Sequence, residues 1–229
     1  MKVLAIGAHP DDIEIFMYGL LSIYKKDGNQ VYTMVATDGA KGGAITGKKL
    51  AKERVNEAIL GLKELSLPIF LNLPDGELGE ELEHRKIIKK NILKIMPDLI
   101  ITHSENDYHA DHKSLSLLTK GAVSHYIPVL NCDTIMGINF NPNYYVDITD
   151  HYEAKKKAIL KHKTQNPQRF IDLFQLMNSY RAAQCNAPKG SYAEAYSFEP
   201  AFPFADLKEI LPSPIKLRPF HIENQHGFL

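Results

Sequence analysis

The segment His9-Pro10-Asp11-Asp12 constrains the fold most, because it directly follows an apolar, β-type run over residues 2–8. Proline disfavours helical backbone at the residue before it and suits the first turn of a helix. We therefore expect His9 at the carboxyl end of a strand and both aspartates in the first turn of a helix. Ligands of open α/β sheets bind at this edge, and an imidazole with two carboxylates suits a metal ion. The alternative is a helix N-cap pair beside a surface histidine.

The same residue types recur near the middle of the chain. Residues 103–112 read His-Ser-Glu-Asn-Asp-Tyr-His-Ala-Asp-His and follow an apolar run, which predicts a strand over 99–102 and a helix from Asp111. Catalytic zinc usually has three protein ligands and one position open to water. Two imidazoles and one carboxylate supply that number: His9, Asp12 and His112. Asp11 would then face the open side of the site, free to act as a base.

Strand-like and helix-like segments alternate through the first 130 residues. This alternation predicts an α/β fold, with a Rossmann-like, mostly parallel sheet covered by helices on both faces. The predicted strands cover residues 2–8, 30–37, 67–73, 99–102, 134–139 and 144–148. The predicted helices cover residues 13–26, 50–65, 82–96, 150–163 and 170–183, with one more starting at residue 111.

The HPDD and HADH segments resemble the PIG-L/LmbE-like family of zinc-dependent N-acetylglucosamine deacetylases. Further landmarks of the family follow in its order: Thr37-Asp38-Gly39, Arg54 with Glu57, Leu73-Pro74-Asp75-Gly76, Val146-Asp147-Ile148-Thr149, Lys155, His162, Gln165 and Tyr192-Ala193-Glu194-Ala195. The similarity covers residues 1–198 and implies a single LmbE-like domain. The family often has a Gly-Gly pair after HPDD, whereas this chain has Phe16-Met17-Tyr18-Gly19.

The resemblance implies a role for each residue of the site. Asp11 would take a proton from water without binding the metal. His109 would act as the acid and stabilise the developing oxyanion, with Asp111 holding one of its ring nitrogens. A role of His109 as a fourth metal ligand stays open. Zinc is the expected cofactor, and Fe²⁺ is the alternative, because two histidines and one carboxylate also suit ferrous iron.

Two further positions are candidates for substrate binding. The guanidinium of Arg54 could bind sugar hydroxyls or a carboxylate, or it could pair with a neighbouring glutamate of its own helix. Asp75 could accept hydrogen bonds from sugar hydroxyls, although a Pro-Asp-Gly sequence also suits a simple turn. A glycine-rich loop over residues 38–43 is expected to rim the pocket. The patterns assign no role to Asp107 or His162.

Composition restricts the partners. Lysine plus arginine and aspartate plus glutamate both number 27, so no net charge favours nucleic acid or an acidic membrane. No apolar stretch approaches the roughly 20 residues of a membrane span, and no leader pattern precedes the first strand. We expect a cytoplasmic enzyme, and by resemblance a homo-oligomer. Residues 199–229 are rich in proline and are expected to form an arm on the domain or on a neighbouring subunit.

The expected function is hydrolytic removal of the acetyl group from an N-acetylglucosamine-type sugar or glycoconjugate. Two alternatives stay open. The same metal site could hydrolyse another N-acyl or carbamoyl substrate, or the protein could bind a metal or a sugar without catalysis. The presence of Asp11 argues against the last alternative, because a site that only binds would not need it.

Overall fold

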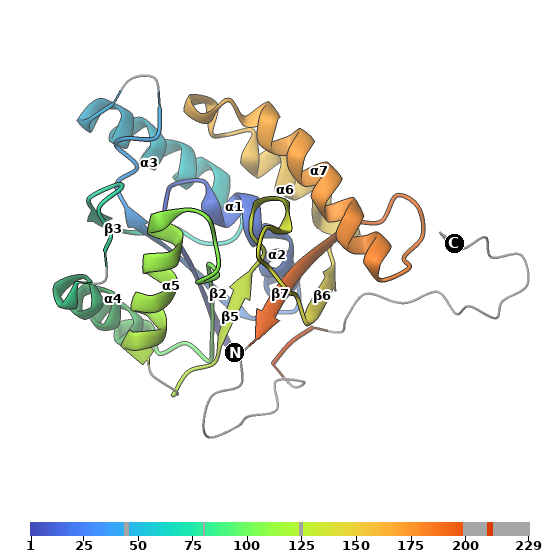
Figure 1. Cartoon of the computed structure of the whole chain (residues 1–229), viewed down its shortest axis with the longest axis horizontal. Coiled ribbons are helices and arrows are strands. Elements are labelled where there is room, and N and C mark those ends of the chain that lie inside the picture. Colours follow the sequence, from blue (N-terminus) through green and yellow to red (C-terminus); the bar gives the residue numbers. More distant parts are fainter. Residues whose placement is uncertain (44–45, 80, 124–125, 199–209, 213–229) are drawn as a thin grey trace, which may run out of the picture.

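In a computed structural model of the chain, which describes residues 1–43, 46–79, 81–123, 126–198 and 210–212, seven strands form one sheet in the order β3-β2-β1-β4-β5-β7-β6 (Figure 1). The strands are β1 (Lys2–Gly7), β2 (Gln30–Thr37), β3 (Ile69–Leu73), β4 (Leu99–Thr102), β5 (Val129–Cys132), β6 (Tyr144–Asp147) and β7 (Ala193–Phe198). Strands β1 to β5 are parallel, and β7 is antiparallel to both of its neighbours. The predicted α/β fold with a mostly parallel sheet is confirmed.

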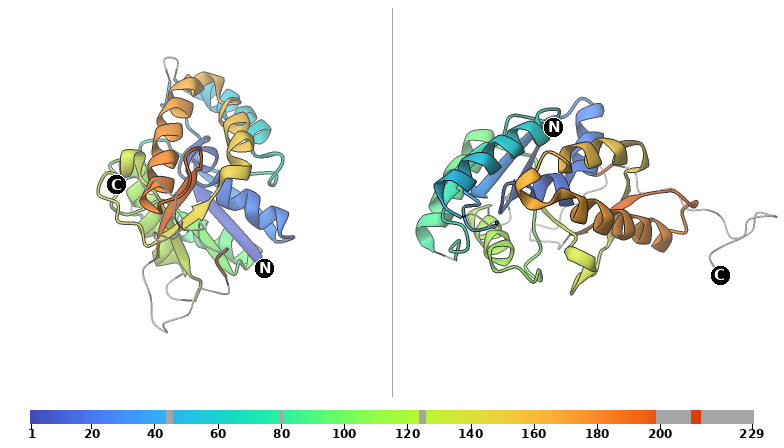
Figure 2. Two further views of the ribbon diagram at one scale, coloured as in Figure 1. Left: turned by 90° about the vertical axis from the view of Figure 1, so that its right-hand side faces the viewer. Right: turned by 90° about the horizontal axis from the view of Figure 1, so that it is seen from above.

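Helices cover both faces of the sheet, because both faces of its central strands are apolar. The helices are α1 (Asp12–Phe16), α2 (Tyr18–Lys26), α3 (Lys48–Leu62), α4 (Leu82–Ile95), α5 (Ala110–Val123), α6 (Tyr152–Ile159) and α7 (Pro167–Gln184), with 3₁₀ turns η1 (Ile135–Gly137), η2 (Thr149–His151) and η3 (Lys163–Gln165). On β1, Val3 and Ala5 join the core under α1, α2, α6 and α7, whereas Leu4 and Ile6 join the core under α4 and α5. Figure 2 shows these two layers from two further directions.

The chain folds outward from β1 to β3 and then returns to β4 on the other side of β1. This reversal is a topological switch point, where the loops after β1 and β4 diverge and leave a crevice outside the sheet. Adjacent strands hold the two loops together, since Ala5 pairs with Ile101 and the Thr102 hydroxyl donates to the Ile6 carbonyl at 2.9 Å. The two motifs of the sequence therefore meet at one edge.

Some elements differ from those predicted. The strand predicted over residues 134–139 is wrong, because this segment contains η1, and the Thr134 hydroxyl closes the turn onto the Ile138 carbonyl at 2.6 Å. Its alternating apolar residues resemble a strand pattern, but Met136 has a φ of 56°. Strands β5 and β7 were not predicted.

The helix predicted over residues 13–26 is broken at Met17, whose φ is −130°. The break is stabilised by Glu194, whose carboxylate accepts the backbone N–H groups of Gly19 and Leu20 at 2.9 and 2.8 Å. Gly19 is required there, since a Cβ atom at this position would lie 2.4 Å from the Ile148 side chain. The single glycine retained from the family's pair therefore has a packing function.

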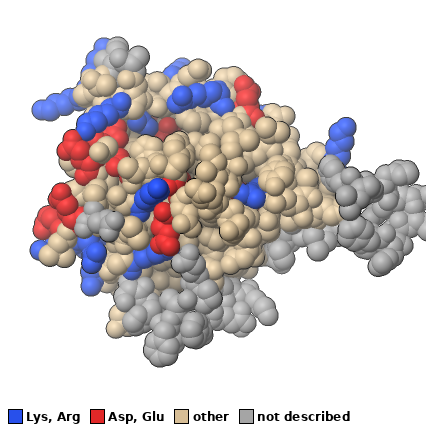
Figure 3. Space-filling model, viewed as in Figure 1, with Lys and Arg blue, Asp and Glu red and all other residues tan. Residues whose placement is uncertain are grey.

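Charge is unevenly spread over the described surface. Figure 3 shows charged side chains gathered over α3 and α4, whereas the surface over α7 carries few of them. No helix in the described part of the chain has the length and apolar character to cross a membrane. Most of the predicted C-terminal arm lies outside the described residues. Within 210–212, the Ile210 carbonyl accepts the Tyr24 hydroxyl at 2.8 Å.

Candidate metal-binding active site

Asp12 is the centre of a buried cluster at the carboxyl ends of β1 and β4. Its Oδ2 atom accepts the backbone N–H of His9 at 2.6 Å and lies 3.3 Å from His9 Nδ1. Its Oδ1 atom lies 3.3 Å from His112 Nε2. All three side chains are less than 10 % exposed. The Asp12 carboxylate therefore lies 3.3 Å from one nitrogen of each imidazole, so the three residues expected to bind a metal are neighbours.

A second layer of carboxylates orients both imidazoles. Asp107 Oδ2 lies 3.0 Å from His112 Nδ1, and Asp111 Oδ2 lies 3.1 Å from His9 Nε2. Because a carboxylate only accepts hydrogen bonds, Asp107 holds a proton on His112 Nδ1 and Asp111 holds a proton on His9 Nε2. The other nitrogens, His9 Nδ1 and His112 Nε2, face Asp12, and when the rings are neutral they carry the lone pairs that a divalent cation would need.

The protonation of these rings also indicates a missing positive charge. Burial alone would lower the pKa of His112, but the Asp12 and Asp107 carboxylates outweigh it and raise the pKa to about 9. The pKa of His9 is likewise raised well above its ordinary value, because Asp12 overcomes the effect of burial. The pKa of Asp12 stays well below its ordinary value despite burial, owing to His112, His103 and His9. Protons thus balance the carboxylate where a metal ion would.

Three further triads overlap this site among the described residues: His9–His109–His112, Asp12–His103–His112 and His9–Asp75–Asp111. Ring geometry distinguishes the two sets that contain His112. His103 and His112 are nearly parallel, with centroids 3.7 Å apart and planes inclined by 14°. Lone pairs of imidazole lie in the ring plane, so these two rings do not converge on one ion about 2 Å from each. His9 and His112 are inclined by 46° and can converge. The His9–His109–His112 set leaves His109 open as a fourth ligand.

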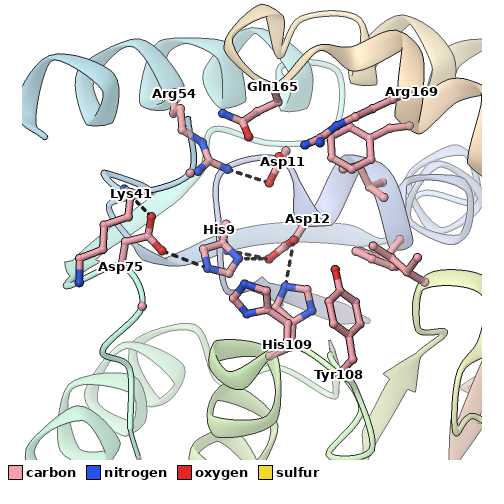
Figure 4. Close-up of a pocket in the computed structure, with 17 residues that line it drawn as sticks. His9, Asp11, Asp12, Lys41, Arg54, Asp75, Tyr108, His109, Gln165 and Arg169 are labelled. Carbon is pink, nitrogen blue, oxygen red and sulfur yellow. Dashed lines mark hydrogen bonds and ion pairs between the residues drawn. The ribbon is translucent and has the colours of Figure 1, made fainter. Parts of the chain in front are cut away.

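Asp11 lies beside the cluster and points into the pocket (Figure 4). Its backbone φ of 146° is one that residues other than glycine rarely adopt, and such strained backbone is typical of functional sites. Burial raises the pKa of Asp11, Arg54 opposes that effect, and the net shift is upward. A raised pKa favours a base that accepts a proton and can later return it.

Arg54 contacts Asp11 directly. Its guanidinium lies 3.1 Å from Asp11 Oδ1 and donates to the Pro10 and Gly39 carbonyls, also at 3.1 Å, and the residue is only 3 % exposed. Gly42 makes room for it, since a Cβ atom there would lie 2.3 Å from the guanidinium. The loop over residues 38–43 thus reaches the pocket, as expected, and packs closely on Arg54.

We expected the Asp111 carboxylate to contact His109, but in the structure it contacts other groups. The carboxylate contacts His9 and accepts the backbone N–H groups of Gly76 and Leu78, so its oxygens are engaged. The backbone N–H of Asp111 donates to His109 Nδ1 at 3.2 Å instead. This bond places the ring proton on Nε2, and burial with the neighbouring His112 and His9 lowers the pKa of His109. A neutral His109 that donates from Nε2 is favoured.

Asp75 is likewise engaged within the protein. Its Oδ1 atom lies 3.3 Å from His9 Nε2, and its Oδ2 atom accepts the backbone N–H of Lys41 at 2.7 Å (Figure 4). Burial opposes ionisation, but these contacts lower the pKa of Asp75 to about 2. The Asp75 carboxylate therefore contacts His9 at Nε2, the ring nitrogen that does not face Asp12, in addition to lining the pocket.

Sequence reasoning assigned no role to several residues that the structure brings to the site. Asp107 holds His112, and its other oxygen accepts the His109 backbone N–H at 3.0 Å. Its position two residues before His109, in a loop that must fold back, is the only feature of the sequence that points to this role.

His162 pairs with Glu14 at 2.8 Å beneath Asp11, and both are buried. The open side of the pocket is lined by Tyr108, Ile135, Gln165, Arg169 and Phe170.

Comparison with known proteins finds a family model, a curated relative and solved structures that this chain is similar to. Residues 4–123 match the family model "PIG-L: GlcNAc-PI de-N-acetylase". A diacetylchitobiose deacetylase of Thermococcus kodakarensis is 32% identical over 240 residues, covering 90% of this chain and 88% of that protein. The structure of an N,N'-diacetylchitobiose deacetylase from Pyrococcus horikoshii, in complex with an inhibitor, superimposes with a TM-score of 0.76 at 25% identity, covering 86% of this chain and 83% of that one. The zinc-inhibited form of the teicoplanin deacetylase Orf2 shares the fold, with a TM-score of 0.67 at 14% identity over 87% of this chain and 99% of that one.

Proposed function

This chain belongs to the PIG-L family of deacetylases, and we propose that it removes the acetyl group from an N-acetylated glucosamine-type sugar, such as a unit of a chito-oligosaccharide. The observation that supports catalysis most is the position of Asp11 beside the metal-type cluster. Asp11 lies outside the converging donor set and lines the pocket. The relatives named for diacetylchitobiose support the sugar class.

We propose zinc as the cofactor, held by His9, Asp12 and His112. The donor set fits, because the Asp12 carboxylate lies 3.3 Å from one nitrogen of each imidazole, and the three side chains lack positive charge when both rings are neutral. When bound, zinc supplies a Lewis acid that polarises the acetyl carbonyl and lowers the pKa of a water molecule to about 7. The teicoplanin deacetylase Orf2, which shares the fold, has a zinc-inhibited form, so zinc binding has a precedent within this fold.

Asp11 acts as the base of the proposed reaction. Its carboxylate takes a proton from the attacking water while Arg54 holds it in place at 3.1 Å. The water oxygen forms a bond to the acetyl carbon, and Asp11 then returns the proton to the nitrogen as the C–N bond breaks. Acetate and the free amine leave, so the step needs no other reactant.

His109 in its neutral form donates a hydrogen bond from Nε2–H to the carbonyl oxygen as that oxygen gains negative charge. The backbone N–H of Asp111 occupies Nδ1, which disfavours an imidazolium. This assignment differs from an imidazolium acid in its pH dependence. A His109→Gln variant, which keeps an N–H donor, should retain more turnover than His109→Ala.

The test is acetate release by the zinc-loaded protein from free N-acetylglucosamine, its nucleotide diphosphate form, a malate glycoside and chito-oligomers. Asp11→Asn should keep zinc and lose turnover, whereas His112→Ala should lose both. The proposal is supported if the wild-type protein releases acetate from one of these substrates and neither variant does. Stoichiometric zinc without acetate from any of them would overturn the sugar assignment in favour of another N-acyl or carbamoyl substrate.

A further inference from the structure

His103, at the end of β4, is a fully buried imidazole that the proposed reaction does not use. It is 0 % exposed, and its Nε2 atom lies 3.1 Å from Asp12 Oδ2. Its ring stacks on His112 at 3.7 Å, and Phe16 contacts it edge-on at 5.7 Å. One side chain therefore touches two of the three proposed metal ligands from the protein interior.

Three neighbours determine the position of the ring proton. Asp12 Oδ2 only accepts, so it requires a proton on Nε2. The Cys132 Sγ atom lies 3.9 Å from Nδ1, and burial raises the pKa of this thiol well above its ordinary value, so its S–H is a weak donor that suits a lone pair on Nδ1. The Ala8 N–H, 3.2 Å from Nε2, alone favours the opposite tautomer. A bond to a carboxylate is about twice as strong as a neutral one, so Nε2–H is favoured.

These residues come from three adjacent strands. Asp12 follows β1, His103 follows β4 and Cys132 ends β5, and the three strands are neighbours in the sheet. Their carboxyl ends place the thiol, the imidazole and the carboxylate in a row directed toward the pocket. An apolar ring would satisfy the packing around His103, but only a donor keeps the second hydrogen bond to Asp12 Oδ2, which also accepts the His9 backbone N–H.

We infer that His103 is a positioning residue of the metal site, which donates from Nε2 to Asp12 and supports His112 by stacking. It is not a ligand itself, because its ring is nearly parallel to that of His112. The inference rests on the proposed metal site at His9, Asp12 and His112. It does not depend on which substrate is hydrolysed.

The main test compares His103→Phe with His103→Gln. The first keeps an aromatic ring and loses the donor, and the second keeps an N–H near the place of Nε2. We expect His103→Phe to weaken zinc binding by about 10- to 100-fold in a chelator competition, and His103→Gln to recover part of the loss. The visible spectrum of the cobalt-substituted protein should change in His103→Phe. His151→Phe, at a distant 3₁₀ turn, is the matched control.

Zinc affinity and cobalt spectrum that are unchanged in His103→Phe would overturn the inference. Both are read without substrate, so a failure of the proposed deacetylation would leave them interpretable. If His103→Phe does not fold, the wild-type protein with ¹⁵N-labelled histidine decides. Its His103 should carry the proton on Nε2, and a proton on Nδ1 would overturn the inference.

Discussion

Two buried polar clusters of this protein look alike but differ in charge balance. Around Glu194, the carboxylate accepts from Lys155 Nζ at 2.8 Å, from the Tyr196 hydroxyl at 2.7 Å and from two N–H groups at the start of α2. Both oxygens of the carboxylate are engaged, and the charges of Glu194 and Lys155 cancel. Around Asp12, three imidazole nitrogens face the carboxylate, and the raised pKa values of His9 and His112 place extra protons there that balance its charge.

This difference separates structure from function. A closed cluster such as that of Glu194 has no place for a ligand, and it serves to join β7, α2 and α6. An incomplete cluster at a topological switch point has a place for a cation. Both contain residues that belong to the family's landmarks, so membership in a landmark alone does not identify a site residue.

The largest effect should come from opening the closed cluster. Glu194→Ala would leave the buried Lys155 ammonium without its partner, and this should lower the free energy of unfolding by about 3–5 kcal/mol. Urea denaturation of the metal-free protein measures the loss. The double variant Glu194→Gln with Lys155→Met is the control, since it removes both charges and keeps an acceptor for the N–H groups of α2, and it should recover part of the stability. A single-variant loss below about 1 kcal/mol would contradict the comparison.

Asp11→Asn should affect catalysis and little else. The amide does not accept the proton of water, so kcat should fall on the order of 10³-fold, within the usual range for a general base. Zinc affinity should stay near that of the wild type, because Asp11 lies outside the donor set. Steady-state acetate release and chelator competition measure the two quantities. Loss of zinc together with activity would make Asp11 a ligand.

The pH dependence of the melting temperature of the metal-free protein tests whether the Asp12 cluster lacks positive charge. Since the folded-state pKa of His112 is raised to about 9 and that of His9 is also raised, their protons stabilise the fold fully below about pH 6.5. That stability is lost as the pH rises toward 9. The melting temperature should therefore fall over this window without metal, and excess zinc should remove the fall. An apo melting temperature that stays constant from pH 6.5 to 9 would contradict the charge deficit.

Sequence alone predicted the parallel half of the sheet and the meeting of both motifs, because each strand-to-helix turn is a local pattern. It did not predict β5 or β7, since β7 is defined by its antiparallel pairing with β5 and β6. Side-chain partners were also beyond reach. That Asp111 contacts His9 and not His109 depends on how the loop carrying Gly76 approaches α5, 35 residues away in sequence.

A substitution at Asp107 should have a smaller effect, on the zinc affinity of the cluster around Asp12. Asp107→Asn keeps the size of the side chain but no longer holds the proton on His112 Nδ1 by a charged bond. Zinc affinity should fall by about 10- to 100-fold, as for other partners of metal-binding histidines. Chelator competition measures it, with Asp98→Asn at the start of β4 as a control that should not change. An affinity equal to that of the wild type would mean that Asp107 only braces its loop.

Arg54→Lys should have the smallest effect, and it distinguishes positioning of the base from binding of substrate. Lysine keeps the positive charge but not the simultaneous bonds to Asp11, Pro10 and Gly39 that the planar guanidinium makes. Because Arg54 opposes the rise in the pKa of Asp11, weakening it should shift the acidic limb of the kcat/KM profile to higher pH, with KM nearly unchanged. A raised KM with an unshifted pH profile would instead assign Arg54 to the sugar, since a residue that acts only through Asp11 has no means of changing ground-state binding.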